Sequence, residues 1–543
     1  MKGERLFRIL GLVDEELIEE AVPGGTVSGG AVRHIPWRRY AAIAACLAVV
    51  CAVGWQFTDR LGNIVDGAGS SGSGINHSPA SGEGQSGAVT DNEPLSVEGT
   101  TFMSYAGPVF PLTTAEPDTG LKAERTLTWD FAMGAYADGS PRQWGAAVTD
   151  GYVLTNPTDS DITVTALYPF AGSFSDLETE LPAAAVDGAA VEAELLAGAY
   201  AGGFQGVWQS DGKGGYVLDG TTLNLAHPDD WTDFKALLES GDYLTRALGK
   251  APVLDIPVTV YEFSDFQAPH EKYSAATQAV EFTIDQEKTT VLTYGFNGGS
   301  WDWETGWRQF SYFVPDGMRA EPEYKCLVVL GEDIGDYTLA GYEDGGCDNE
   351  IDGVSCTVAR RETTLDEVLD TLCQYYLTER ANYQYGMEDA EGTVPYGLFR
   401  RAVSELMVQY GVLSGENVTD RYADGRLDDM VGETMSHTRV MYLAFPVTVP
   451  AGGPVDITFN MRKEPSYDFG CSGSENVGLQ GYDLVTRLGS TLTFTAQTAA
   501  LVNTENVELV RQNLGFDLEN GVTEVPLDMD VEHYYLEIRP KDA

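Results

Sequence analysis

The most aromatic stretch of the chain is GGSWDWETGWRQFSYF, residues 298–313. Side chains two residues apart share one face of a β-strand, so Trp301 and Trp303 would lie together. Exposed aromatic faces stack on sugar rings or dock protein partners, whereas buried ones pack a core. The stretch therefore gives Trp301, Trp303 and Trp307 as candidate ligand-binding aromatics, although core packing is the favoured interpretation.

Cys347 and Cys356 enclose the acidic loop DNEIDGVS and are the best candidate pair for a disulfide that clips a hairpin. Five cysteines follow the apolar run near the N-terminus, an odd number, so free buried cysteines are the alternative. The loop also imitates the start of a calcium-binding loop. Its twelfth position is Ala359, where calcium needs a bidentate carboxylate, so an acidic hairpin without metal is favoured.

Motifs of enzyme active sites are missing or incomplete in the sequence. Ser210 and Lys213 match the S-x-x-K pattern of penicillin-recognising enzymes, but the partner motifs S-D-N and K-T-G do not occur. The six histidines are scattered along the chain, and carboxylates are too abundant to be diagnostic. We therefore predict no catalytic residue, no metal ligand and no cofactor, and we expect a protein that is not an enzyme.

An uncharged apolar run over residues 40–57, YAAIAACLAVVCAVGWQF, divides the chain. Its 18 residues reach the short end of the length that crosses a bilayer as a helix. Arg33, Arg38 and Arg39 precede it, which predicts a cytoplasmic N-terminus and an exported C-terminal part. A cleaved signal peptide, a lipoprotein modified at Cys46 and a buried soluble helix are the alternatives to this single-pass cell-membrane anchor.

Charge is distributed unequally on the two sides of the apolar run. Residues 1–39 carry six basic and six acidic side chains, so the whole net charge of −50 belongs to the rest of the chain. Such a surface repels nucleic acid, which excludes nucleic-acid binding as a function. The simplest interpretation is a solvated acidic surface that keeps an exported protein soluble.

The outer part is predicted to be mainly β, with antiparallel sandwich-like domains and a helical insertion near residues 364–412. Alternating apolar and polar residues place Ile162, Val164, Ala166 and Tyr168 on one strand face. A helix is expected to end near Leu248. The expected division is a cytoplasmic amphipathic segment (1–39), a transmembrane helix (40–57), a disordered linker (58–98), a β-rich outer domain (99–225), a second β-rich region opening with a helix (226–363), and the helical insertion followed by a C-terminal β-rich region (364–543).

Two resemblances add to this description. The order VDEELIEEA, spacer, WRRYAAIAACLAVV and large exported part resembles single-pass, anti-sigma-factor-like proteins of Gram-positive bacteria. Residues 1–39 lack the Cys/His zinc cluster that many anti-sigma domains carry, because they contain His34 and no cysteine. The segment YVLTNPTDSDITVTALYPF resembles a strand–turn–strand of bacterial Ig-like sandwich domains.

The first function hypothesis is a membrane-anchored sensor or regulator. Its outer part would bind a surface ligand, such as a carbohydrate or protein, and its amphipathic segment would bind a partner in the cell, which the resemblance implies is a sigma factor. The alternative is a cell-surface binding or adhesion protein with a simple N-terminal anchor. An exported hydrolase is the third hypothesis.

Overall fold

The computed structural model describes residues 105–132, 134–135, 141–142, 144–177, 181–200, 208–210, 216–218, 231–316, 323–383, 394–409, 413, 425–469 and 476–541. In these ranges no helix combines the length and the apolar character that a membrane span requires. The predicted amphipathic segment, transmembrane helix and linker, residues 1–98, lie outside the described residues.

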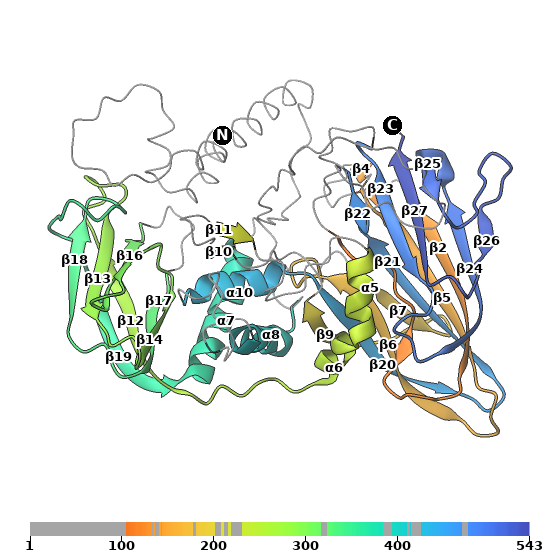
Figure 1. Cartoon of the computed structure of the whole chain (residues 1–543), viewed down its shortest axis with the longest axis horizontal. Coiled ribbons are helices and arrows are strands. Elements are labelled where there is room, and N and C mark those ends of the chain that lie inside the picture. The colour runs from red at the N-terminus through yellow and green to blue at the C-terminus, as the bar shows by residue number, and fades with distance from the viewer. Residues whose placement is uncertain are drawn as a thin grey trace. The chain divides into compact units, whose positions relative to one another are not determined.

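The described part is mainly β, as predicted, and its largest sheet has seven strands (Figure 1). In spatial order they are β26 (Glu524–Pro526), β24 (Thr493–Val502), β2 (Lys122–Asp130), β5 (Ala146–Thr155), β21 (Pro454–Lys463), β7 (Ala183–Val186) and β8 (Ala189–Ala190). β2 pairs with β24 in parallel, and the other neighbours pair antiparallel.

Two four-stranded sheets pack on the seven-stranded sheet. One contains β1 (Thr113–Thr114), β6 (Ile162–Gly172), β20 (Arg439–Val449) and β9 (Glu194–Tyr200). The other contains β22 (Tyr467–Asp468), β23 (Gln480–Val485), β27 (His533–Pro540) and β25 (Val507–Gln512), with the short helix η1 (Thr504–Asn506) before β25. Two further pairs are β3 (Gly134–Ala135) with β4 (Pro141–Arg142), and β10 (Trp208–Ser210) with β11 (Tyr216–Leu218).

Strands that are far apart in the sequence form this first sandwich together. Strands β2, β5 and β6, from the range 99–225, pair with β24, β21 and β20, from the range 364–543. Both ranges therefore contribute to the same sheets. The residues after β11 and before β20 form the helices and the second sandwich described below.

The core of the first sandwich contains the side chains of one face of β6, along which buried and more exposed residues alternate. Val164, Ala166 and Tyr168 are buried, and the Tyr168 ring stacks on Phe459 of β21 with centroids 3.7 Å apart. The shared face predicted for β6 is confirmed. From Ala166 onward the other face is buried too, since Leu167 packs in a cluster with Phe234. A helix covers the face that would otherwise meet water.

A second, smaller sandwich lies between residues 257 and 364. One of its sheets has the order β14 (Thr289–Tyr294), β17 (Lys325–Gly331), β12 (Pro257–Gln267) and β19 (Ser355–Thr364). The other has the order β15 (Gly298–Asp302), β16 (Trp307–Phe313), β13 (Thr277–Thr283) and β18 (Tyr337–Tyr342). All pairs are antiparallel. Aromatic side chains from both sheets fill the space between them, including Phe263, Phe296 and Tyr312.

Five helices are described between the strands. They are α5 (Trp231–Ser240), α6 (Asp242–Leu248), α7 (Leu365–Tyr383), α8 (Tyr396–Gln409) and α10 (Leu427–Ser436). Helices α7 and α8 confirm the predicted helical insertion. The helix expected to end near Leu248 does so, but it is divided at Gly241, whose φ of 69° is left-handed and interrupts the helical path. Helix α10 was not predicted.

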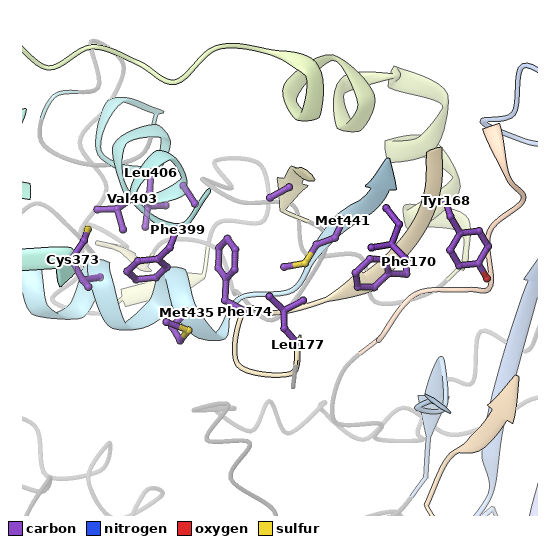
Figure 2. Packing of buried hydrophobic residues seen from close by; sticks show 14 of the residues in the cluster. Tyr168, Phe170, Phe174, Leu177, Cys373, Phe399, Val403, Leu406, Met435 and Met441 are labelled. Carbon is purple, nitrogen blue, oxygen red and sulfur yellow. The ribbon is translucent and has the colours of Figure 1, made fainter. Parts of the chain in front are cut away.

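Helices α7, α8 and α10 share one buried cluster with both sandwiches. Figure 2 shows Phe399 and Val403 of α8 and Met435 of α10 near Phe174, which follows β6. Phe174 and Phe399 meet edge to face, with ring centroids 5.7 Å apart. Leu292 of β14 belongs to the same cluster, so packing is continuous from the first sandwich through the helices to the second.

Candidate functional site

The predicted aromatic stretch forms the hairpin β15–β16. Trp301 pairs with Arg308 and Asp302 with Trp307, and residues 303–306 turn the chain. The carboxylate of Asp302 accepts the backbone N–H groups of Glu304 and Thr305, which lowers its pKa because these donors favour the charged form. These bonds fix the turn that follows β15.

Two of the three tryptophans of this hairpin lie at the surface. Trp301 is 46% exposed and Trp303 is 67% exposed, and their rings meet edge to face with centroids 6.3 Å apart. Core packing is therefore the wrong interpretation for both residues. Trp307 is half-buried and pairs with Thr283 of β13. Trp303 follows the last residue of β15, so it belongs to the turn instead of the strand.

Arg308 holds Trp303 in place. Its guanidinium carbon lies 4.7 Å from the centroid of the Trp303 ring, within the range of a cation–π interaction. Its Nη2 donates to Oε1 of Gln286 at 2.8 Å, and Nε2 of Gln286 donates to the Trp303 carbonyl oxygen at 2.7 Å. Side chain and backbone of Trp303 are thus both fixed, so the exposed ring has a defined orientation without a ligand.

Beside Trp301 the edge of the second sandwich is hollow. β14 and β15 are the edge strands of their sheets on this side, joined by residues 295–297. The hollow has a volume of about 160 Å³. It is lined by Thr293, Phe296, Asn297, Gly298, Gly299, Trp301, Phe310 and Arg426.

Gly299 keeps this hollow open. It pairs with Phe310, so a side chain at residue 299 would point toward the space between the sheets. A Cβ atom there would lie 3.3 Å from the Phe310 ring and 3.6 Å from the Trp301 ring. Phe296 and Phe310 are almost fully buried and form the floor, while Trp301 forms an exposed wall.

Arg426 reaches the hollow from a distant part of the sequence. The N–H of Thr293 on β14 donates to the carbonyl oxygen of Gly425 at 2.9 Å, and Thr293 and Arg426 form a bridge. The guanidinium of Arg426 also faces Asp429 at 3.4 Å and Asp428 at 3.7 Å. A positively charged group therefore stands at the rim, partly neutralised by two carboxylates.

The predicted Cys347–Cys356 disulfide is wrong, because both residues are free thiols. The Cys347 thiol lies near Ser311, and the Cys356 thiol lies near Tyr312. Ser311 and Tyr312 are consecutive on β16, so their side chains point to opposite faces of the sheet. The two sulfurs lie on those opposite faces. Burial raises the pKa of both thiols.

Other polar clusters are buried and closed. Asp483 accepts hydrogen bonds from the Tyr105 hydroxyl and lies 2.8 Å from Nε2 of His533. Trp231 of α5 stacks on the His533 ring, with centroids 4.4 Å apart. Both oxygens of Asp483 are bonded and the histidine is covered, so this cluster joins α5 to β23 and β27.

A second buried cluster joins β2 to β5. Arg125 donates to both carboxylate oxygens of Asp150 at 2.8 Å, and the Tyr152 and Tyr168 hydroxyls donate to the same carboxylate. Arg125 also donates to the carbonyl oxygens of Val485 and Phe110, so four of its five N–H groups have acceptors. The cluster is a bonded part of the core.

Metal ligands do not gather in the described part of the chain: no group of three or more His, Cys, Asp or Glu side chains there is arranged to hold an ion. Ser210 lies on β10, and Lys213 is outside the described residues. A second hollow, beside Phe131 and Pro540, has a volume of about 20 Å³. This is room for about one water molecule.

The aromatic composition singled out Trp301 and Trp303, but it favoured core packing for them and gave no indication of the hollow beside them. The one local signal was Asn297-Gly298-Gly299 before the tryptophans, since adjacent glycines leave a strand edge without side chains. No signal pointed to Arg426. Comparison with known proteins finds no matching family model, no similar curated protein and no similar solved structure.

Proposed function

We propose that this chain is a membrane-anchored, extracytoplasmic binding protein, and that the hairpin β15–β16 presents its ligand site. The observation that carries the proposal is the pair Trp301 and Trp303, exposed yet held in a fixed orientation. Exposed tryptophan lowers the solubility of a protein, so a pair of exposed tryptophans indicates an interaction site. Tryptophan is also enriched among the residues that contribute most to binding energy. A carbohydrate or protein on a cell surface is the ligand class.

Further support comes from the sequence outside the described residues. The run 40–57 provides the anchor, residues 58–98 provide a polar spacer of Gly and Ser, and the net charge of −50 lies beyond the anchor. The Ig-like resemblance is part of the same proposal, because bacterial domains of that kind present binding loops and hairpins outside the cell.

The sensor or regulator hypothesis adds a second partner to this binding function. It is favoured by the apolar stripe Leu6, Leu10, Val13 and Leu17, which has helical spacing and an acidic opposite side. A helix this short gains order by docking on a partner. In the regulator form, ligand binding outside would alter the contact of residues 1–39 with a sigma factor inside.

The test uses the full-length protein in lipid nanodiscs, presented to a glycan array and to a panel of cell surfaces. We expect retention by at least one surface, and loss of retention in the double variant Trp301→Ala/Trp303→Ala. Leu339→Ala is the matched control, because Leu339 is 38% exposed on β18, at the opposite edge of the same sheet. Retention that persists in the double variant would remove the proposed site.

A separate experiment decides between regulator and adhesion protein. A peptide of residues 1–39 is immobilised and exposed to purified sigma factors of a Gram-positive bacterium. Specific retention of one sigma factor supports the regulator. If none is retained while the full chain still binds a surface, the adhesion function stands alone.

A further inference from the structure

We propose that the hollow beside Trp301 binds one uncharged six-membered sugar ring, as the end or a side branch of a surface glycan. The inference rests on the proposed binding function and names the ligand class for its site. Size, lining and charge each restrict the occupant, and they agree.

Size restricts the occupant to a single ring. The hollow measures about 160 Å³. A cavity of about 150 Å³ holds one benzene molecule, and pockets for whole drug-sized ligands begin near 300 Å³. A pyranose is bulkier than benzene, so an oligosaccharide would insert the face of one ring and leave the outer hydroxyl groups of that ring and its other rings outside, where Trp303 stands on the same hairpin.

The lining has the two characters of a sugar ring. A pyranose has an apolar C–H face, and the buried rings of Phe296 and Phe310 together with Trp301 offer aromatic surface to it. It also has hydroxyl groups around its edge. Asn297 lines the hollow and accepts the Phe313 N–H with its Oδ1 at 3.1 Å, which leaves the two N–H donors of Nδ2 for ligand hydroxyl groups.

Charge excludes the ionic alternatives. An acidic sugar would gain from Arg426, but Asp428 and Asp429 lie 3.7 and 3.4 Å from that guanidinium, and the chain carries a net charge of −50. Two nearby carboxylates and a strongly negative surface outweigh one cation. A cationic ring would lose the hydration of its ammonium group against the buried Phe296 and Phe310 rings, and no carboxylate side chain among the described residues lines the hollow to replace that hydration. An uncharged ring avoids both penalties.

Gly299 determines access in this account. Residue 299 lies on the edge strand β15, where a β-branched residue suits the strand, although its Cβ would lie 3.3 Å from the Phe310 ring and that ring must shift slightly. Gly299→Val places two methyl groups in the space that the ring would occupy. It leaves Trp301 and Trp303 present, so it separates binding in the hollow from binding to the tryptophan surface.

The experiment measures binding to full-length protein in nanodiscs by saturation-transfer NMR and calorimetry. The probes are methyl glucopyranoside, methyl galactopyranoside and N-acetylglucosamine as neutral rings, glucuronate as the anion and glucosamine as the cation. We expect at least one neutral ring to bind at least tenfold tighter than both ionic rings. Gly299→Val and Trp301→Ala should each weaken it at least tenfold, while Leu339→Ala should change it less than twofold.

Several outcomes would overturn the inference, and all but the last differ from failure of the proposed function. Glucuronate or glucosamine binding as tightly as the neutral rings would contradict it, as would unchanged neutral binding in Gly299→Val with its thermal unfolding unaltered. If the full chain binds a protein partner through Trp301 and no sugar, the proposed function stands and this inference fails. If no surface, protein or sugar binds, both fail.

Discussion

The guanidinium of Arg308 lies over the ring of Trp303, 4.7 Å from its centroid, on a hairpin where Trp301 is also exposed. The pair fixes an aromatic surface that a flexible turn would otherwise leave mobile. Because Trp303 is already fixed, fewer side-chain rotamers of the protein need to be ordered when a ligand binds, which favours affinity.

Removing this contact should loosen the surface without unfolding the protein. Arg308→Gln loses the cation–π interaction and the bond to Gln286, so we expect stability to fall by about 1–2 kcal/mol. Ligand affinity should fall about threefold to tenfold. Urea unfolding and calorimetry measure the two effects. Arg360→Gln is the control, since Arg360 pairs with Asp333 at a different, half-exposed place. Equal effects of both variants would contradict the role of Arg308.

The buried ion pair of Arg125 and Asp150 should be far more important to stability than any surface pair. Asp150→Asn leaves the Arg125 charge buried with a neutral partner, which costs about 3–5 kcal/mol. The matched control is Glu508→Gln, which removes an exposed partner of Arg539 and should cost under about 1 kcal/mol. Urea unfolding of the full-length variants compares them. Similar losses of unfolding free energy in the two variants would contradict the larger contribution of the buried Arg125–Asp150 pair.

Helix α5 should be held to the first sandwich by its apolar face. Phe234 is fully buried against Tyr105 and Phe110, so Phe234→Ala should cost about 3–5 kcal/mol. Lys235→Ala breaks a half-exposed ion pair with Glu532 and should cost under about 1 kcal/mol. Thermal unfolding measures the stability of both variants. A larger loss of stability in Lys235→Ala would show that the ion pair, and not the apolar face, holds α5 to the sandwich.

Stability should fall at high pH because of buried tyrosines. Burial raises the pKa of Tyr442 above its ordinary value of 10. Below pH 10 the Tyr442 hydroxyl keeps its proton in both the folded and the unfolded chain. Above it the unfolded chain loses the proton and the folded chain retains it, so stability falls by about 1.4 kcal/mol per pH unit for each such residue. Tyr442→Phe should reduce that slope and leave stability at pH 7 nearly unchanged. An unaltered slope between pH 10 and 12 would contradict the burial of this hydroxyl.

Cys347 and Cys356 should behave as separate thiols. Both should be alkylated in denaturant without reductant, and mass spectrometry counts the added groups. Cys347→Ser should cost about 1 kcal/mol or less, compared with the 2–5 kcal/mol lost with a native disulfide. If either residue were alkylated only after reduction, the two residues would form a disulfide and the assignment as free thiols would be wrong.

Local patterns in the sequence predicted the elements that depend on local physics. Alternation placed Val164 and Tyr168 on one face, and helical spacing located α7 and α8, because a side-chain period is set by neighbouring residues. Pairing was not predictable: Lys122 pairs with Thr493 across most of the chain. Pairings of this kind are decided by the packing of the whole core.

The same distinction applies to the candidate site. Trp301 and Trp303 stood out by composition, and their exposure follows from the edge position of β15, which no local pattern reveals. Arg426 reaches the hollow only because Gly425 adopts a left-handed φ of 75°, and a Cβ atom there would lie 2.8 Å from the Val291 carbonyl oxygen. The membrane anchor and its orientation stay predictions of the sequence.

The central claim is that Trp301 and the hollow beside it form the ligand site. Its most direct test is the dissociation constant of a neutral glycan for the full-length protein, compared between wild type, Trp301→Ala and Leu339→Ala. The account predicts a loss of at least tenfold for Trp301→Ala and less than twofold for Leu339→Ala. Equal affinity of wild type and Trp301→Ala, with both proteins folded, would contradict it.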